Sequence, residues 1–532
     1  MRALALTRNT LLMAFKKFLV RPEGCIWTSS LPVQESIELD FLFSIKLNLL
    51  YYISMSDKIP LFVFALAKKF SEAGFEIYLV GGSVRDLLAG REVKDWDFTT
   101  DATPEQMLQL LPNAFYDNKF GTVGIAIKHL IEEEHPGVIE ITTFRTEQGY
   151  ADRRHPEKVE WGKTIEEDLS RRDFTINAMA LSIRHSEALP KNPPDEILLR
   201  QPSDQDDGYL IDLFNGREDL QKRLIRAVGD PNVRFKEDAL RLMRAIRFAA
   251  QLGCSIEEKT LQAITQDAAL LAEISKERIR DELLKILASD FPYEGIMLLK
   301  NTGLLAYILP ELLEGIGVSQ VRPGRHHTED VFTHNVLSLK FCPSKDPIVR
   351  FATLIHDIAK PRVASADEHG LVIFYNHEIA GAQMAYEIAN RLHFSKKERE
   401  KITKLIRWHM FTVDEHITDA AVRRFIRRIG VDNVKDMIDL RIGDRLGSGT
   451  KTAESWRLKQ FKERIEEQLA PAPFSINDLA VDGNDVMREL QIKPGRKVGE
   501  ILQKLFEEVD EDLSKNKREY LMKRIHELGG MN

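Results

Sequence analysis

Two aspartates separated by a single residue, Asp95 and Asp97, have a spacing that suggests metal-assisted chemistry. On an extended segment alternate side chains point to the same side, so both carboxylates can bind the same pair of hard cations. Two such ions support phosphoryl transfer, because one lowers the pKa of an attacking hydroxyl and the other neutralises charge on the leaving group. A lone Asp-x-Asp is more often a solvated turn than a metal site, so the neighbouring motifs must decide between the two interpretations.

A glycine pair and an arginine lie shortly before these aspartates. The run EIYLVGG ends in Gly81 and Gly82, and Arg85 follows them. Because glycine has no β-carbon, the backbone can approach a ligand and donate N–H groups to phosphate. An arginine near the start of the following helix can bind a triphosphate with its forked guanidinium. These residues together predict a nucleoside triphosphate site beside carboxylates that hold Mg²⁺.

Helices and strands must alternate to position these groups. Apolar residues recur at helical spacing over residues 59–74, and a β-rich run follows. Further strands are expected at residues 122–130 and 138–144, and a helix is expected after Thr103, an N-cap residue followed by proline. This first section is therefore predicted to be α/β.

Further motifs follow in order along roughly residues 79–290. They resemble the successive motifs of the class II tRNA nucleotidyltransferase and bacterial poly(A) polymerase superfamily. The matching strings are GGSVRD with DWD, RRDFTINAMA (171–180), IDLFNGREDL (211–220), RFKEDALRLMRAIRF (234–248) and ISKERIRDELLKIL (274–287).

The resemblance assigns roles to three more residues near the carboxylates. It implies a third catalytic and metal-binding carboxylate on a later strand, and the matching position is Glu140 in IEITTFR. It also implies that Arg172 and Asp173 contact the ribose and phosphates of the nucleotide, where a carboxylate accepting from a 2′-hydroxyl selects ribonucleotides. The alternatives are an outward polar residue of an alternating strand for Glu140 and a salt bridge at a helix entry for the other two.

Asp238 and Arg241 are expected to choose the base. Three residues apart on a helix, they can present an acceptor beside a forked donor. Cytosine and adenine both offer an amine donor beside a ring-nitrogen acceptor, so this pair should accept CTP and ATP and reject UTP and GTP. The alternative is a surface salt bridge. Arg244 and Arg247 continue the row of cations toward the triphosphate.

The loop from Thr146 to Gly162 bears on which nucleotides are added. In the resembling family a flexible loop at this place is needed for terminal A addition and is shortened in enzymes that add only CC. Its presence favours addition of A or of the whole CCA. The loop contains Tyr150, Arg153, Arg154 and His155.

A second set of possible metal ligands lies in a helical region at residues 326–446. Its order H…HD…H…H…D resembles the HD phosphohydrolase superfamily, which implies a divalent transition metal and a secondary phosphohydrolase activity, or else an inactive fold that holds tRNA. Imidazole with carboxylate suits such a metal, and His356 with Asp357 is expected to bind one ion while His377 and His409 complete a second. The full set is His334, His356, Asp357, His377, His409 and Asp444.

Composition sets the broad class of the protein. Of its 532 residues 43% are hydrophobic and 30% are charged, which is ordinary for a globular protein. The three cysteines form no CxxC pair, which indicates a reducing compartment such as the cytoplasm. A net charge of −7 means that RNA contacts must come from local basic patches. One candidate patch is RRFIRRIG (423–430), whose arginines form either a phosphate-contacting stripe or a solvated helix face.

The patterns predict an α/β polymerase-β-like nucleotidyltransferase head followed by mostly α-helical neck, HD and tail domains. After Arg171 the pattern is helical almost throughout, and no convincing strand follows Asn232. The basic, acid-free start of the chain is either a presequence or a dispensable leader, since Met55 is a good alternative start. The expected divisions are a leader at 1–54, the head at 55–182, the neck at 183–320, the HD domain at 321–470 and a tRNA-binding tail at 471–532.

The expected reaction is addition of CCA, from CTP and ATP, to the 3′ end of tRNA, with release of pyrophosphate. Enzymes that add only CC or only A, and a poly(A) polymerase, remain as alternatives within the same chemistry. A metal-dependent phosphohydrolase whose head only binds nucleotide remains as an alternative of another class, and so does a non-catalytic RNA-binding protein.

Overall fold

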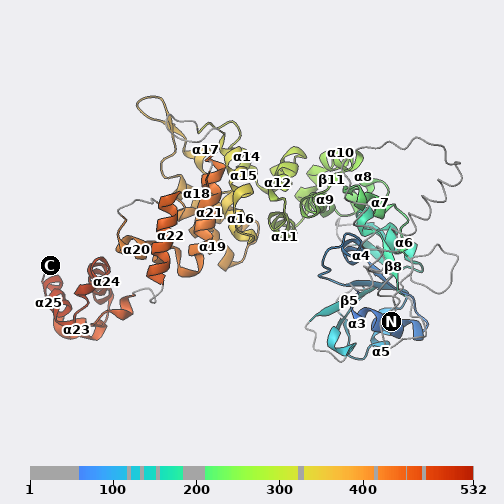
Figure 1. Cartoon of the computed structure of the whole chain (residues 1–532), viewed down its shortest axis with the longest axis horizontal. Helices are drawn as coiled ribbons and strands as arrows, with labels where there is room; N and C mark the ends of the chain where they lie inside the picture. The colour runs from blue at the N-terminus through green and yellow to red at the C-terminus, as the bar shows by residue number, and fades with distance from the viewer. Residues whose placement is uncertain are drawn as a thin grey trace, which may run out of the picture.

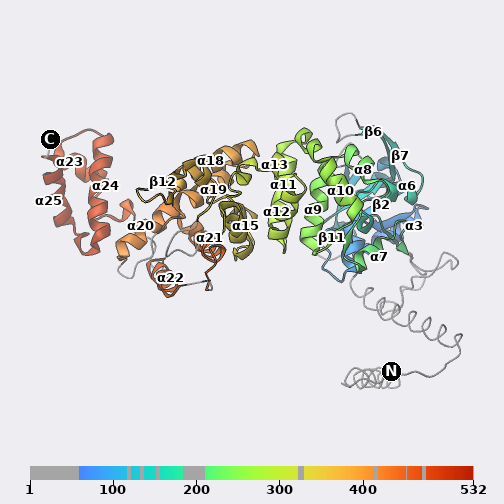
Figure 2. The ribbon, with the colours of Figure 1, turned by 90° about the horizontal axis from the view of Figure 1, so that it is seen from above.

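The computed structural model is elongated, with a sheet-containing head at one end and a small helical unit at the other (Figures 1 and 2). The leader, the Pro-rich segment 186–207, and Arg153, Arg154 and His155 lie outside the described residues. Among those described, no helix is both long and apolar enough to cross a membrane. The structure describes residues 59–116, 121–131, 137–150, 156–183, 210–320, 329–411, 417–450, 452–453, 455–469 and 475–530, without side chains for 146–150 and 156–160.

The described strands of the head form a seven-stranded sheet in the order β3-β4-β5-β2-β1-β8-β9. Its neighbouring strands are antiparallel except β2 and β5, which run parallel and set Asp97 opposite Glu140. The expected strands of the head are confirmed, except that the strand expected at 122–130 ends at Ala126 and a 3-10 helix follows at Ile127–His129. The bounds are β1 Ile77–Val80, β2 Asp97–Thr100, β3 Phe115–Tyr116, β4 Thr122–Ala126, β5 Val138–Thr143, β8 Ala180–Ser182 and β9 Leu210–Ile211.

Helices pack against this sheet through a core that includes Phe70, Leu79 and Ile141, all fully buried. The expected helix start at Thr103 is confirmed, since its side chain accepts from the backbone of Gln106 in a capping box. A separate hairpin joins β6 (Arg145–Tyr150) to β7 (Pro156–Trp161) within the loop expected to matter for A addition. The head helices are α3 Leu61–Glu72, α4 Gly82–Leu88, α5 Pro104–Leu110 and α6 Ile165–Ser170.

The neck is helical, and its α9 (Leu240–Leu252) separates two environments. Leu242, Met243 and Ile246 are fully buried in the core, whereas Arg241 and Arg244 lie on the side that faces the head. Other helices in this part are α7 Gly216–Gln221, α8 Pro231–Glu237, α10 Glu258–Gln266, α11 Lys276–Leu287 and α12 Pro292–Asn301.

The rest of the described chain is mostly helical, and it includes the four-residue helices α13 Leu305–Ile308, α14 Pro310–Leu313 and α17 Lys360–Val363. The hydrophobic core continues from the neck into α22, whereas the last three helices have a core of their own around Val486, Leu505 and Leu521. The helices are α15 Val331–Phe341, α16 Pro347–Leu354, α18 His377–Arg391, α19 Lys396–Trp408, α20 Asp419–Ile429, α21 Val434–Gly447, α22 Trp456–Leu469, α23 Gly483–Leu490, α24 Arg496–Glu511 and α25 Arg518–Gly529.

The expectation of an almost purely helical chain after Arg171 is wrong at several short strands. β8 and β9 extend the head sheet, and a boundary at 182/183 would pass between them. Such strands are two or three residues long and too short to show a period, so only their tertiary partners reveal them. The others are β10 Leu224–Ile225, β11 Ser255–Ile256, β12 Ser365–Ala366 and β13 Val372–Ile373.

Candidate active site

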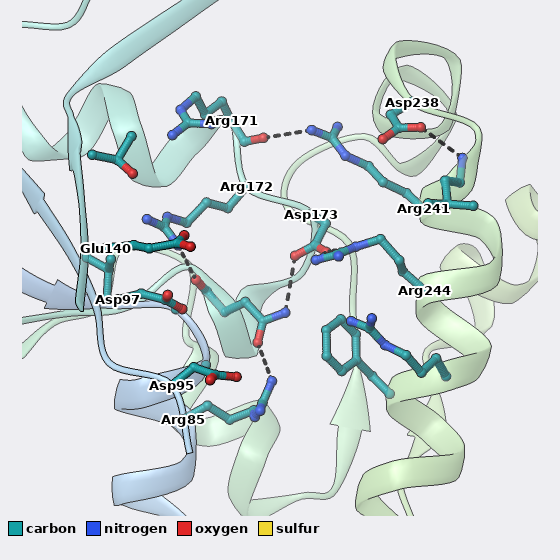
Figure 3. Close-up of a pocket in the computed structure, with 18 of the residues that line it drawn as sticks. Arg85, Asp95, Asp97, Glu140, Arg171, Arg172, Asp173, Asp238, Arg241 and Arg244 are labelled. Carbon is teal, nitrogen blue, oxygen red and sulfur yellow. Dashed lines mark hydrogen bonds and ion pairs between the residues drawn. The ribbon is translucent and has the colours of Figure 1, made fainter. Parts of the chain in front are cut away.

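Three carboxylates meet at the edge of the head sheet. Asp97 begins β2 and is the register partner of Glu140 on β5, as the resemblance implied. Asp95 lies in the turn just before β2, where the Ser83 hydroxyl donates to its carbonyl oxygen at 3.1 Å and accepts from Asp97 N at 2.9 Å. Figure 3 shows the three carboxylates on one side of a shared cavity.

The electrostatics of these carboxylates favour a cation. Burial raises the pKa of Asp97, and the nearby Glu140 and Asp95 raise it further, although Arg172 and Arg85 oppose them. Crowded carboxylates of this kind are stabilised in their ionised form when a positive ion lies between them. Oxygen donors are also the ligands that Mg²⁺ prefers.

Gly81 connects β1 to α4 and requires glycine. Its φ of +68° lies in the left-handed region, and a β-carbon there would lie 2.9 Å from Arg172 Nη1 and 3.9 Å from Asp97 Oδ2. Gly82 begins α4, and Arg85 follows on the same helix, where its Nη1 donates to Asn177 Oδ1 at 2.8 Å. The glycines and Arg85 line the cavity as expected.

Arg172 and Asp173 lie in the cavity wall, and both are paired within the protein. Arg172 Nη2 lies 2.9 Å from Asp168 Oδ2. Asp173 accepts from Arg244 at 2.5 Å and from Asn177 at 3.2 Å. Burial alone would raise the pKa of Asp173, but Arg244 and Arg241 outweigh it and lower the pKa to about 2. Asp173 is therefore an ionised acceptor at neutral pH.

Asp238 and Arg241 do not share one helix, so the expected helix-face pairing is wrong. Asp238 follows α8 in an extended conformation, and α9 begins only at Leu240. Asp238 Oδ2 accepts from Arg278 Nη2 at 2.8 Å, while Arg241 donates to the carbonyl of Arg171 at 3.1 Å and pairs with Glu237. Both side chains nevertheless line the cavity, opposite the carboxylates (Figure 3).

Arg244 and Arg247 complete the basic wall around Phe248. The guanidinium carbons of Arg85, Arg244 and Arg247 lie 5.3, 5.4 and 4.2 Å from the centre of this ring. Arg247 Nη1 also pairs with Glu282 at 2.9 Å, and burial lowers the pKa of Arg247 to about 10. Every residue expected to bind nucleotide thus faces one cavity of about 840 Å³.

Several cavity residues were missed by sequence reasoning. Asn177 lies inside a quoted motif and links Arg85 to Asp173, so its position in RRDFTINAMA was the available signal. Arg171, Phe248, Arg278 and Lys285 also lie within quoted motifs, and Thr142 and Arg145 lie within IEITTFR. Gln251 lies outside the quoted motifs. The missed residues are Thr142, Arg145, Arg171, Asn177, Phe248, Gln251, Arg278 and Lys285.

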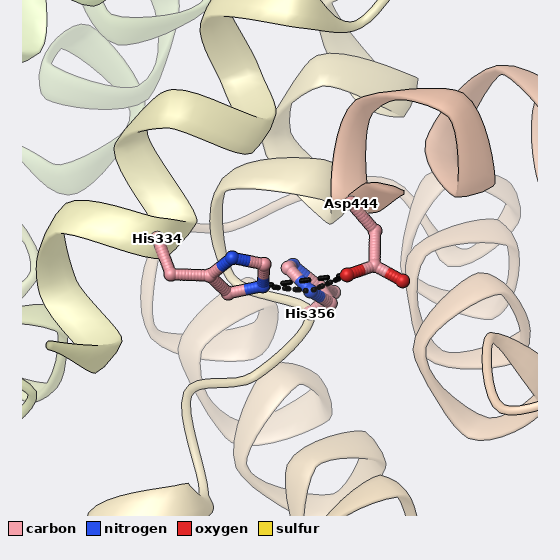
Figure 4. A group of neighbouring side chains, drawn as sticks. All are labelled: His334, His356 and Asp444. Atoms are coloured by element: carbon pink, nitrogen blue, oxygen red, sulfur yellow. Dashed lines mark hydrogen bonds and ion pairs between the residues drawn. The ribbon is translucent and has the colours of Figure 1, made fainter. Parts of the chain in front are cut away.

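The six expected ligands of the helical region converge as two neighbouring triads. Their possible ligand atoms lie within 4.8 Å of one another in each triad. His334, His356 and Asp444 form the first triad, drawn in Figure 4, and Asp357, His377 and His409 form the second. The two triads adjoin, since His356 Nε2 lies 3.3 Å from Asp357 Oδ2, so the expected sharing of one ion by His356 and Asp357 stays a prediction. We call these six residues the histidine–aspartate cluster.

Close helix packing positions the first triad. A β-carbon on Gly443 of α21 would lie 2.6 Å from the Ser338 carbonyl oxygen on α15, so glycine lets these two helices approach. The imidazole Nδ1 atoms of His356, His377 and His409 lie 2.7–2.8 Å from backbone carbonyl oxygens, which directs Nε2 of each ring toward the cluster. Within the described structure, Nε2 of His377 and of His409 is buried and has no hydrogen-bond partner.

Most arginines of the segment RRFIRRIG contact other groups within the fold. Arg423 Nε donates to Asp510 Oδ1 on α24 at 2.8 Å, and Arg427 pairs with the same carboxylate. The guanidinium of Arg428 lies 4.9 Å from the Trp408 ring centre. The interpretation as a phosphate-contacting stripe is therefore wrong for Arg423 and Arg427, which join α20 to the last helical unit.

Comparison with known families matches three consecutive parts of the chain. The poly A polymerase head domain matches residues 77–226, and the "Probable RNA and SrmB- binding site of polymerase A" matches residues 253–315. A model described as tRNA nucleotidyltransferase domain 2 matches residues 367–525.

Curated relatives match just under half of the chain. A CCA-adding enzyme of Geobacillus kaustophilus is 42% identical over 245 residues, which are 46% of this chain and 53% of the relative. A CCA-adding enzyme of Lactobacillus helveticus is 46% identical over 234 residues, or 43% and 51% of the two chains. The chain thus spans about half the length of these relatives in each alignment.

Solved structures match over most of the chain. The Bacillus stearothermophilus CCA-adding enzyme in complex with CTP is 26% identical, with a TM-score of 0.62 over 87% of this chain and 96% of the other. A CCA-adding enzyme complexed with CTP, 21% identical with a TM-score of 0.56 over 89% and 97% of the two chains, shares the fold. By its ordered motifs, its head and its matched relatives, the chain belongs to the superfamily of class II CCA-adding enzymes and poly(A) polymerases.

Proposed function

We propose that this chain is a template-independent tRNA nucleotidyltransferase that adds CCA, from CTP and ATP, to the 3′ end of tRNA. The observation that carries the proposal is one cavity with Asp95, Asp97 and Glu140 on one side and Asp238 with Arg241 on the other. Such a cavity can hold a whole nucleotide between reacting and recognising groups. The names of the matched CCA-adding enzymes support the same reaction.

Asp95, Asp97 and Glu140 would hold Mg²⁺, and the raised pKa of Asp97 fits carboxylates that await a counter-ion. The bound metal would supply activation of the RNA 3′-hydroxyl and neutralisation of the phosphates. The protein itself binds the triphosphate through Arg85, Arg172, Arg244 and Arg247, with backbone N–H groups of Gly81 and Gly82 beside them. Asp173, ionised and buried, accepts from the ribose 2′-hydroxyl.

Base choice falls to Asp238 and Arg241. Asp238 accepts from the exocyclic amine of C or A, and Arg241 donates to the adjacent ring nitrogen. Both residues have other partners in the structure. Binding the base exchanges Glu237 for a base atom at Arg241, whereas the Asp238 carboxylate has acceptor sites for both Arg278 and the base amine. A bidentate pairing of this kind discriminates by about 1–3 kcal/mol, by analogy with base readout in nucleic-acid complexes.

The test is incorporation of labelled nucleotides into tRNA transcripts that end before C74, before A76, or are mature, with magnesium present. Addition of C, C and A followed by arrest is the expected result. Addition of A alone or of CC alone would replace the proposal by a partial enzyme, and long A tails by a poly(A) polymerase. No incorporation would overturn it.

The histidine–aspartate cluster supports a second candidate function, a metal-dependent phosphohydrolase. Its ligands are six buried side chains in two triads, and two imidazole Nε2 atoms there have no hydrogen-bond partner within the described structure. Buried imidazole and carboxylate together suit a divalent transition metal. Metal analysis of the purified protein, with hydrolysis of phosphate esters by wild type and His356→Ala, tests it: loss of bound metal and hydrolysis is expected.

The final helical unit would contact tRNA, and the divisions into head, neck, HD and tail domains would follow the boundaries given above, with β9 joined to the head. A cytoplasmic location rests on the absence of paired cysteine motifs in the sequence.

A further inference from the structure

A second cavity, of about 440 Å³, lies beside the histidine–aspartate cluster. Its walls come from the two residues after His409, from α21, and from the first turn of α22. Arg441 reaches from this cavity to the cluster, because its Nη1 lies 2.7 Å from Asp444 Oδ2. Its lining residues include Met410, Phe411, Arg441, Arg445, Trp456 and Arg457.

The charge of this cavity favours an anion. Among the described residues that line it are three arginines and no carboxylate. Two of the arginines are held in place: Arg441 by Asp444 and by the Phe411 ring, whose centre is 5.7 Å from its guanidinium carbon, and Arg445 by donation to the Thr452 carbonyl at 3.1 Å. Guanidinium groups fixed in this way bind phosphate without a large cost in side-chain ordering.

The same cavity exposes apolar surface beside the arginines. Trp456 is 59% exposed and Met410 is 57% exposed. An exposed indole next to guanidinium groups is the combination that stacks a nucleobase while the arginines hold its phosphate. The volume is also in the range of small-ligand sites.

We propose that this cavity binds one nucleotide, with the base stacked on Trp456 and the phosphate on Arg441 and Arg445. Through Arg441 the phosphate would lie next to Asp444, and this placement beside a metal centre rests on the second function proposed above. Binding itself does not depend on that function. The nucleotide is either a free mononucleotide or the terminal nucleotide of an RNA strand.

The experiment is equilibrium dialysis of the full chain with labelled AMP, comparing the wild type with Trp456→Leu and Arg445→Gln. Wild type is expected to bind one AMP per chain more than either variant, because the head cavity remains in all of them. Lys459→Gln is the matched control, since it removes a cation from the exposed side of the same helix, outside the cavity. This control should bind as the wild type does.

Equal stoichiometry and affinity in the wild type, both variants and the control would overturn the proposal. A tetranucleotide with a 3′-phosphate in place of AMP distinguishes the two sources. Tighter binding that is lost in Trp456→Leu identifies an RNA end, and weaker binding identifies a free nucleotide. A His356→Ala protein that binds AMP normally but hydrolyses nothing would show that the nucleotide site stands independently. If the wild type also hydrolyses no phosphate ester, the proposed phosphohydrolase function is wrong, and the proposed nucleotide site is unaffected.

Discussion

At the scale of single residues, the head cavity depends on side chains that hold one another. Asn177 connects Arg85 to Asp173, Asp173 holds Arg244, and Phe248 lies among the arginines. The carboxylates and five of the cavity arginines could be predicted from the sequence, because their types and motifs carry the chemistry. Asn177 and Phe248 lie within the same motifs, but their roles could not be predicted, because an amide and an aromatic ring gain them only from neighbours that are distant in the sequence.

Gly81→Ala is expected to lower kcat/KM for nucleotide addition by about 100-fold, since small displacements of reacting groups have effects of that size. The added β-carbon would lie 2.9 Å from Arg172 Nη1 and force the triphosphate-binding wall to move. Gly74→Ala is the matched control: its φ is also positive, at +81°, but nothing lies within 4 Å of the new carbon. It should lose about 1–2 kcal/mol of stability and keep its activity. Equal activities in the two variants would contradict the assignment.

Arg278→Met is expected to reduce discrimination between CTP and UTP by about tenfold. Arg278 holds the Asp238 carboxylate at 2.8 Å in the cavity, so its loss leaves the proposed acceptor without a fixed orientation. The measurement is the ratio of kcat/KM for the two nucleotides. Lys276→Met, two residues earlier on the same helix and outside the cavity, should leave this ratio unchanged. A fall in rate with the ratio preserved would show that Arg278 acts on something other than base choice.

At the scale of elements, the spacing of apolar residues and the helix N-cap residues predicted the strands and helices of the head well. β5 was found from its alternation, and the capping box at Thr103 fixed a helix start. The break between α8 and α9 was not predicted, because the amphipathic pattern runs through it. The helix is interrupted at Asp238, whose carboxylate accepts from Leu240 N and from Arg278. The grouping of the metal ligands also depended on how α15 and α21 pack.

Helix α6 provides a test of electrostatic stabilisation within one element. Burial alone would raise the pKa of Asp168, but Arg171 and Arg172 lower it to about 2. Because this value lies below the ordinary 3.8, ionised Asp168 stabilises the fold above pH 3.8, and this contribution is lost as the pH falls through 2. It corresponds to roughly 2 kcal/mol.

Asp168→Asn should therefore lower the free energy of unfolding by about 2 kcal/mol at pH 7 and by much less near pH 2. Urea denaturation at the two pH values measures both differences. Glu166→Gln changes an exposed carboxylate on the same helix and should have little effect at either pH. A difference for Asp168→Asn that is the same at both pH values would mean that packing, and not charge, explains its contribution.

At the scale of the whole molecule, the chain separates its proposed chemistry from its proposed tRNA-binding end. The head and the last helical unit lie at opposite ends of the elongated structure, with α15, α18 and α21 between them (Figures 1 and 2). These three helices carry His334, His377 and Asp444 of the histidine–aspartate cluster. A substrate that reaches both ends must be long. Changes at the far end should then affect binding of tRNA without affecting binding of CTP.

Arg423 and Asp510 join the last helical unit to α20, and both are buried. Asp510→Asn weakens this ion pair and leaves two arginines without their carboxylate, so the unit should lose its fixed position. The expected result is a several-fold increase in KM for full-length tRNA, with KM for CTP and kcat on a minihelix that carries only the acceptor stem unchanged. Arg424→Met is the control, because Arg424 is 43% exposed and lies 3.9 Å from Glu511, a weak surface pair. If Asp510→Asn raised KM for tRNA and for the minihelix equally, the last helical unit would not be the part of the molecule that contacts tRNA beyond its acceptor stem.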